Sequence, residues 1–152
     1  MRHKNNAVVR QAVISDIEAL SQLFDGYRQF YGRSSDVPAA KEFLLARFNR
    51  GESTIFIAHS SETPVGFAQL YPSFSSTFLA RTFILNDLFV VPPARRQGVG
   101  EQLMSATVAY AKELGAARVS LSTAVTNEAA QALYHAAGWR RDEQFLVYHF
   151  AI

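Results

Sequence analysis

The sequence contains no cysteine in its 152 residues, which excludes disulfides, thiolate metal sites and a cysteine nucleophile. Any group transfer by this protein must therefore use another nucleophile or pass directly to the acceptor. No apolar run approaches the roughly 20 residues that span a bilayer, and the opening segment Met1–Asn6 leads into no apolar stretch of the signal-peptide type. We therefore expect a cytoplasmic protein that does not enter a membrane.

An excess of charge of one sign is also missing. Fifteen Lys and Arg oppose thirteen Asp and Glu, so the formal net charge is only +2. Disordered tails and obligate nucleic-acid binders carry far denser charge. The basic residues Arg2, Lys4 and Arg10 are typical of a solvated chain end, so no direct nucleic-acid binding is expected. The four histidines lack metal-ligand spacing, so no metal site is predicted.

Apolar residues, by contrast, are plentiful enough for one core. They make up 49% of the chain, and no repeat or linker interrupts them, so a single domain over residues 1–152 is predicted. The periodicity changes along the chain between that of strands and that of helices. Strands are expected at residues 8–13, 54–58, 65–71, 81–91 and 118–123, with closing strands at Trp139 and at residues 144–150. Helices are expected to begin near residues 15, 38, 99 and 127. This order predicts a mixed sheet covered by helices.

A strand, a tight turn and a helix start carry the clearest chemical signal. The strand ends at Pro92 and Pro93, because proline cannot donate to a sheet ladder. The turn that follows reads Arg95-Arg96-Gln97-Gly98-Val99-Gly100. Unpaired N–H groups and the dipole at a helix start favour an anion, the two glycines allow close approach, and the two arginines can add charge-assisted hydrogen bonds. A turn whose glycines serve packing alone is the alternative interpretation.

Two competing phosphate motifs are excluded. The turn lacks the Gly-Lys-Ser/Thr end of a P-loop, and it has neither the first-strand context nor the third glycine of the dinucleotide fingerprint. A second pattern lies downstream, and it reads Asn127-Glu128-Ala129-Ala130-Gln131-Ala132-Leu133-Tyr134-His135-Ala136-Ala137-Gly138-Trp139.

Together, the two patterns resemble the GNAT superfamily of acetyl-CoA-dependent N-acetyltransferases. The turn is similar to the family's Arg/Gln-x-x-Gly-x-Gly/Ala pyrophosphate loop, and the second pattern to its Asn-x-x-Ala-x-x-Leu-Tyr-x-x-x-Gly-Phe/Trp motif. Segments 71–76 and 84–90 look like the branch related to yeast-type histone/polyamine acetyltransferases. The resemblance covers nearly the whole chain. It implies an α/β (α+β) fold, a mixed, mostly antiparallel sheet of six to seven strands flanked by about four helices and splayed open between strands 81–91 and 118–123.

The resemblance also implies acetyl-CoA as co-substrate, with no metal. The pantetheine arm would pair with backbone groups of the central strand, and the turn would hold the pyrophosphate. The donor-binding residues implied in this way are Leu88, Phe89, Val90, Arg95, Arg96, Gln97, Gly98, Val99, Gly100, Asn127 and Ala129. For Asn127 a helix N-cap is an equally good interpretation, and both roles can coexist.

For catalysis, the resemblance implies that Tyr134 is the general acid that protonates the departing CoA thiolate. A phenol with a pKa near 10 and a thiol near 8.5 are close enough for useful proton transfer. The incoming amine must lose a proton, and relatives that acetylate spermidine and spermine carry a glutamate where this chain has Asn86, whose amide is no base. Asp87 is the adjacent carboxylate, but strand alternation sends it to the opposite face unless the strand bulges there. Deprotonation through water is the alternative.

The acceptor pocket is expected between the first pair of helices and the central strands. Tyr27, Phe30 and Tyr31 would lie near it as substrate residues, because aromatic faces suit a cationic amine. Asp25 and Asp36 would add negative charge. The alternative is that the aromatic residues belong to the core and the aspartates are solvated.

The predicted function is direct transfer of the acetyl group from acetyl-CoA to a primary amine of a small molecule, polyamine or amino-acid-like, in a ternary complex. The absence of cysteine favours direct attack. Acetylation of protein lysines or N-termini is the alternative, and a non-catalytic acyl-CoA sensor is a further one, against which Tyr134 argues. A homodimer is expected, because segment 145–150 carries apolar residues on both faces.

Overall fold

The computed structural model describes residues 7–152 and divides into two compact units, which meet in the sequence between Ser122 and Thr123. The predicted basic chain end, with Arg2 and Lys4, lies outside the described residues. The described part of the first unit runs through β1 (Ala7–Gln11), η1 (Ile14–Asp16), α1 (Ile17–Phe30), α2 (Val37–Arg50), β2 (Thr54–Ser60), β3 (Thr63–Ser75), β4 (Ala80–Val90), η2 (Pro92–Ala94), α3 (Val99–Glu113) and β5 (Val119–Ser120). The second unit contains α4 (Glu128–Ala136).

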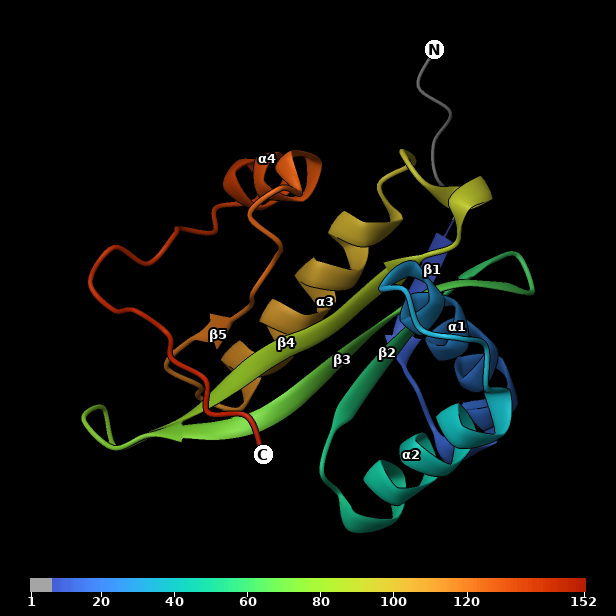
Figure 1. The fold of residues 1–152 in the computed structure, drawn as a ribbon, viewed down its shortest axis with the longest axis horizontal. Coiled ribbons are helices and arrows are strands. Elements are labelled where there is room, and N and C mark those ends of the chain that lie inside the picture. The colour runs from blue at the N-terminus through green and yellow to red at the C-terminus, as the bar shows by residue number, and fades with distance from the viewer. Residues whose placement is uncertain (1–6) are drawn as a thin grey trace. The chain divides into compact units, whose positions relative to one another are not determined.

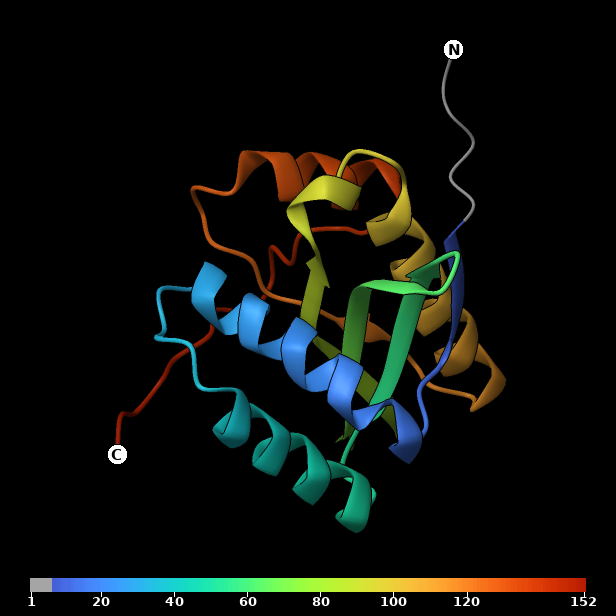
Figure 2. The same ribbon diagram turned by 90° about the vertical axis from the view of Figure 1, so that its right-hand side faces the viewer.

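One sheet forms the centre of the first unit (Figure 1). Its strands follow the order β1-β2-β3-β4-β5, and each pair is antiparallel except β4 with β5. Helices α1 and α2 lie side by side over one face of this sheet (Figure 2). Phe67 of β3 points into the α1 face, where its ring meets Phe24, whereas the neighbouring Gly66 lies against Leu103 of α3. Since side chains alternate along a strand, α3 covers the opposite face.

The apolar core between α1, α2 and the sheet brings the first helix close to β4. Its buried members are Ala12, Leu20, Leu23, Phe24, Ala40, Leu44, Ile55, Ile57, Phe67 and Phe89. Gly26 of α1 lies directly over Phe89, where an added Cβ would stand 3.2 Å from the ring. A side chain here would require the Phe89 ring or α1 to shift, so this glycine allows the helix to lie close to the strand that carries Asn86 and Asp87.

The fold class predicted from the sequence is confirmed, since residues 7–152 combine four α-helices with a mixed, mostly antiparallel sheet. The predicted strand count of six to seven is wrong for the described residues, whose sheet has five strands. Residues 118–123 form a strand only at Val119–Ser120, and residues 139–150 form none. Apolar alternation favours a strand, but a strand also needs a hydrogen-bonding neighbour. Within residues 7–152, no described strand pairs with segment 139–150.

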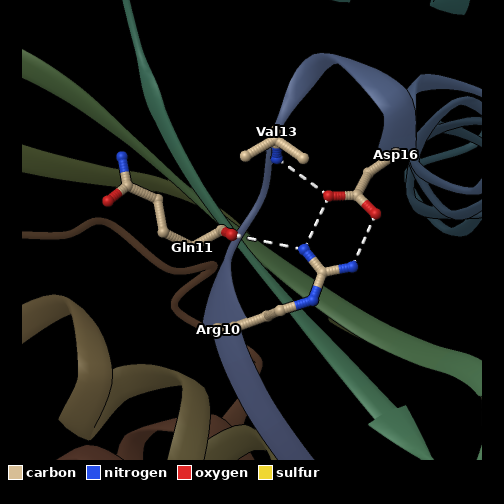
Figure 3. Close-up of polar contacts among 4 residues, drawn as sticks. All are labelled: Arg10, Gln11, Val13 and Asp16. Atoms are coloured by element: carbon tan, nitrogen blue, oxygen red, sulfur yellow. Dashed lines mark hydrogen bonds and ion pairs between the residues drawn. The ribbon is translucent and has the colours of Figure 1, made fainter.

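The junction between β1 and α1 is closed by a charged pair. Arg10 contacts both carboxylate oxygens of Asp16, each at 2.7 Å, and the Val13 N–H donates to Asp16 Oδ2 at 2.8 Å (Figure 3). The hydrogen bond from Arg10 holds the pKa of the Asp16 carboxyl below its ordinary value. The ionised carboxylate therefore stabilises the turn that leads the chain from the edge strand into the first helix.

We expect Asp16→Asn to lower the stability at pH 7 by about 1 kcal/mol, which is about 3 °C in Tm for a chain of this size. Because the folded-state pKa of Asp16 is depressed, this stabilisation is present above the unfolded pKa near 3.9 and is lost as the pH falls. Thermal unfolding of both proteins between pH 3 and 7 measures the effect. Glu18→Gln, which breaks the exposed pair with Lys41, is the control and should change Tm little. A constant Tm difference across this range would contradict the assignment.

Candidate functional site

Strand β4 carries a bulge where the sequence places its candidate base. Gln69 of β3 pairs with Asp87, but the next residue, Leu70, pairs with Leu85, so Asn86 is an extra residue in β4. The bulge brings Asp87 to the face covered by α1, and Asn86 remains exposed beside it. The sequence allowed Asp87 as the base only if the strand bulges at this position, and that bulge is present.

The Asp87 carboxyl is buried in a polar cluster. It is 2% exposed, and it accepts hydrogen bonds from Gln69 Nε2 at 2.5 Å and from Asn86 Nδ2 at 2.9 Å. Burial raises the pKa of Asp87 above its ordinary value, while hydrogen bonds from Gln69, Asn86 and Tyr27 oppose that rise. A carboxyl in these surroundings can take up a proton more readily than a solvated one, which is what a general base requires.

The three predicted substrate residues are brought together at the C-terminal end of α1. The Tyr27 ring lies 5.0 Å from Tyr31, and Tyr31 lies 5.4 Å from Phe30. Tyr27 is half-buried, and its hydroxyl donates to the Asn86 carbonyl oxygen at 3.2 Å and interacts with Asp87. Burial, followed by the negative charge of Asp87, raises the Tyr27 pKa, so this phenol stays protonated. Phe30 and Tyr31 are exposed. The cluster therefore leads from solvent to the bulge.

The two aspartates that were expected to attract the amine instead hold the α1–α2 connection. Asp25 is 3% exposed and accepts from Gln29 Nε2 at 2.8 Å, Ser35 Oγ at 2.7 Å and the Asp36 N–H at 2.7 Å. Asp36 caps α2 by accepting from the Ala39 N–H at 3.1 Å. Both carboxylates are occupied in local structure, because a loop between two helices leaves backbone donors that side chains must satisfy. Their predicted role as attractors is corrected accordingly.

Sequence reasoning missed two residues of this cluster, Gln69 and Tyr71 of β3. Gln69 is fully buried, and Tyr71 is half-buried on the same face of the strand. Burial, with the nearby Asp87 charge, raises the Tyr71 pKa to about 12. A signal was available for Gln69, since it is the one polar side chain in the run of residues 65–70, whose other members are apolar residues and a glycine. For Tyr71, an aromatic residue near a strand end, the sequence offers no comparable signal.

The free edge of β4 fits the predicted donor. Leu88, Phe89 and Val90 pair with β3 on one side. On the other side β5 pairs with β4 only at Phe83 and Ile84, so within the described residues no strand covers the edge along Leu88–Val90. Alternate N–H and C=O groups therefore face away from β3. An extended arm with amide groups, such as pantetheine, matches this row of donors and acceptors.

The turn after η2 fits the pyrophosphate of the donor. Arg96 and Gly98 adopt left-handed conformations with φ of 62° and 83°, and Gly98 is the N-cap of α3. Residues 95–98 are exposed, while Val99 is buried and fixes the start of the helix. Left-handed residues next to right-handed ones aim successive N–H groups at one point, which makes an anion-binding concavity. Gly100 follows in the first turn of α3, where N–H groups have no intrahelical acceptor.

The side chain of Arg95 connects this turn to the aromatic cluster. Its Nε donates to the Val90 carbonyl oxygen at 2.8 Å, and its guanidinium carbon lies 5.4 Å from the centre of the Phe30 ring and 5.6 Å from that of Phe89. Sequence reasoning assigned Arg95 to the pyrophosphate alone. In the structure the same residue also lies against the exposed ring of Phe30, a predicted substrate residue.

The second unit carries the remaining candidate residues. Asn127 caps α4, since its Oδ1 accepts from the Ala130 N–H at 3.2 Å, and the N-cap alternative is thereby confirmed. Ala129 is exposed in the first turn. Tyr134 is half-buried, with its ring 6.3 Å from that of Trp139. The roles of Asn127, Ala129 and Tyr134 in donor binding and acid catalysis stay predictions.

Residues 7–152 hold no candidate metal site and no candidate membrane span. No group of three or more His, Asp or Glu side chains there is arranged to hold a metal ion. None of the helices in this range has the length and apolar character that a bilayer crossing requires.

Comparison with known proteins adds independent information. The family model described as "Acetyltransferase (GNAT) family" matches residues 17–139. An uncharacterized N-acetyltransferase of Bacillus subtilis (strain 168) is 46% identical over 140 residues, which cover 92% of this chain and 94% of that protein. The D-amino-acid N-acetyltransferase of Saccharomyces cerevisiae (strain ATCC 204508 / S288c) is 29% identical over 144 residues, or 91% of this chain and 89% of that protein.

A solved structure agrees with these sequence matches. The crystal structure of a probable acetyltransferase superposes with a TM-score of 0.91 at 41% identity, and the match covers 95% of this chain and 97% of that one. The agreement extends over both the sequence and the fold.

Proposed function

The chain belongs to the GNAT family of acetyltransferases, and on this premise we propose that it acetylates a primary amine of a small molecule, polyamine or amino-acid-like. Enzymes of this family are acyl-CoA-dependent N-acetyltransferases, so acetyl-CoA supplies the acetyl group as a thioester. Transfer goes directly to the amine within a ternary complex, since the chain has no cysteine to carry an acyl intermediate.

The observation that carries this proposal is the buried carboxyl of Asp87 at the β4 bulge. An alkylamine has a pKa near 10.4 and is almost wholly protonated at pH 7, so it must lose a proton before it can attack. Asp87 takes up that proton from the substrate nitrogen, directly or through a water molecule, and burial favours its protonated form. Asn86 donates to the other carboxylate oxygen and holds the group in place.

The surroundings of Asp87 favour a small cationic acceptor. Tyr27, Phe30 and Tyr31 form a path of aromatic faces, and such faces attract ammonium groups. The similarity to the yeast D-amino-acid N-acetyltransferase supports an amino-acid-like acceptor and the yeast-type branch of the family. A polyamine satisfies the same aromatic faces and is the second member of the proposed class.

The donor is held largely by main chain. Backbone groups of Leu88, Phe89 and Val90 pair with the pantetheine arm, and one of their N–H groups polarises the thioester carbonyl. The turn holds the pyrophosphate, through the residues Arg95, Arg96, Gln97, Gly98, Val99 and Gly100. Asn127 and Ala129 are assigned to the donor by the family motif that they match.

Tyr134→Phe should lower kcat by about 100-fold, because the phenylalanine ring cannot protonate the thiolate that leaves. The family motif carries this assignment. Steady-state kinetics with saturating acetyl-CoA measure the effect, and an unchanged KM for acetyl-CoA would show that the loss lies in the chemical step. Tyr110→Phe removes a half-buried hydroxyl of α3 that bonds to Thr54, outside the proposed site, and serves as the control. Wild-type turnover of Tyr134→Phe would remove the assignment.

The enzyme is further proposed to work in the cytoplasm as a homodimer. The exposed apolar side chains of the closing segment support an interface, and they are Phe145, Leu146, Val147, Tyr148 and Phe150. Light scattering in solution tests the dimer, and a monomer at micromolar concentration would contradict it.

The proposed function is tested by following CoA release with a thiol-reactive dye. The protein itself contributes no thiol background, because it lacks cysteine. Each mixture contains the enzyme, acetyl-CoA and one candidate acceptor. The acceptors are polyamines, D- and L-amino acids, aminoglycosides, and peptides with a lysine or a free N-terminus. Release that depends on a small amine confirms the proposal. Release with peptides alone would support protein acetylation, and acetyl-CoA binding without release in any mixture would support the sensor.

A further inference from the structure

Gln69 is a fully buried polar side chain for which the proposed mechanism has no use. It is 0% exposed on β3, and its Nε2 donates to Asp87 Oδ2 at 2.5 Å. Its other amide atom, Oε1, is buried and has no hydrogen-bond partner within residues 7–152. A buried acceptor without a donor costs stability, and a native protein that retains one often does so for function.

The position of Gln69 is tied to the bulge. It is the last residue of β3 in register before the shift, and its strand partner is Asp87 itself. The extra residue Asn86 therefore turns the Asp87 carboxyl toward Gln69, while Asn86 donates to the opposite oxygen. Gln69 contacts the carboxyl from the neighbouring strand, so it can fix the direction in which Asp87 points.

A glutamine amide suits a carboxyl that gains and loses a proton. The ionised carboxylate only accepts hydrogen bonds, whereas the protonated carboxyl also donates one. Nε2 of Gln69 donates to the ionised form. A half-turn about the last side-chain bond exchanges the two amide atoms and presents Oε1 as the acceptor that the protonated form needs. The amide thus has one group for each state of Asp87.

We propose that Gln69 is the positioning residue for Asp87, whose carboxyl it holds in both protonation states while the acceptor amine is deprotonated. The proton leaves the substrate nitrogen for an Asp87 oxygen and later passes to solvent, and Gln69 neither gains nor loses one. This inference rests on the proposed function for the role of Asp87. The contact between the two side chains does not depend on it.

Two phenols face Asp87, and one of them, Tyr71, also interacts with the Gln69 side chain and with a cation. Tyr27 faces it from α1 and Tyr71 from β3, and both phenols have raised pKa values. Arg47 of α2 interacts with Tyr71. Burial raises the pKa of Asp87, and the bond from Gln69 is the largest effect that lowers it. Loss of that bond should therefore raise the pKa of Asp87 further.

Carbon-13 NMR of the aspartate carboxyls in the free protein tests this inference without acetyl transfer. Asp87→Asn identifies the Asp87 signal by its disappearance. In Gln69→Leu the titration midpoint of Asp87 should rise by about one pH unit, since one hydrogen bond to the charged form is lost. Thr82→Val removes another buried polar group from β4 and is the control, with the midpoint unchanged. An unchanged midpoint in Gln69→Leu would overturn the inference.

Gln69→Glu keeps the shape of the side chain, which leucine does not. It places a second carboxyl against the first, so the pair should titrate in two steps, the upper one above the wild-type midpoint of Asp87. A single step at the wild-type midpoint contradicts the contact. For the folded variants, the acid limb of kcat/KM should move to higher pH with the NMR midpoint.

The kinetic and NMR results separate the two proposals. An active Asp87→Asn enzyme overturns the base role of Asp87, and the catalytic role of Gln69 falls with it. An inactive Asp87→Asn enzyme together with an unshifted Asp87 midpoint in Gln69→Leu overturns the inference on Gln69 alone.

Discussion

Asp87→Asn is expected to lower kcat/KM for the amine by at least 100-fold at pH 7. An amide of the same shape cannot take the proton from the substrate nitrogen, and a positioned base typically contributes between about 10² and 10⁴ in rate. The loss should shrink as the pH is raised, because the fraction of free amine in solution then increases. Initial rates between pH 6 and 10 measure both effects. Acetyl-CoA binding should stay unchanged.

We also expect Asp87→Asn to change how the stability of the protein depends on pH. The pKa of Asp87 is raised in the folded state, so the native protein keeps this proton to higher pH than the unfolded chain. The contribution of Asp87 to wild-type stability is therefore fully present below the unfolded pKa near 3.9, and it is lost as the pH rises through the folded pKa. Asp87→Asn should lack this decrease in stability.

The matched control for the rate measurement is Glu18→Gln, which changes an exposed carboxylate to an amide. Wild-type turnover of Asp87→Asn would exclude Asp87 as the base.

Gly98→Glu is expected to abolish measurable acetyl-CoA binding. The new carboxylate stands at the N-cap of α3, in the turn proposed to receive the pyrophosphate, and it repels that anion. It also adds a side chain where close approach of the phosphate needs none. Isothermal titration with acetyl-CoA measures the loss, and circular dichroism confirms that the variant is folded.

Gly98→Ala separates the charge from the backbone effect. The φ of 83° at Gly98 is strained for any residue with a Cβ, so both substitutions share a cost of about 1–2 kcal/mol. Alanine should weaken binding only modestly, since it adds no charge. Equal losses in the two variants would mean that strain in the turn explains the effect, and wild-type affinity of Gly98→Glu would place the pyrophosphate elsewhere.

Local patterns predicted the turn and the helix start that follow β4. The start of α3 at Val99 follows from the glycine turn and the apolar period after it, and the left-handed φ of Gly98 is one that glycine adopts without strain. Two neighbouring prolines end β4 for an equally local reason. The acceptor side was predicted less well. Asp25 bonds to Ser35 and to the Asp36 backbone across a loop, and no sequence period shows that contact.

By itself, the sequence predicted the fold class, the family and the turn that precedes α3, because each of them shows in a local pattern or motif of the chain. The tertiary structure alone decided which face Asp87 occupies. Strand alternation places Asn86 and Asp87 on opposite faces, and only the register of β3 against β4 inserts the bulge that brings Asp87 to α1 beside Gln69. That register arises from pairing and packing between distant segments, so no local signal in either strand contains it.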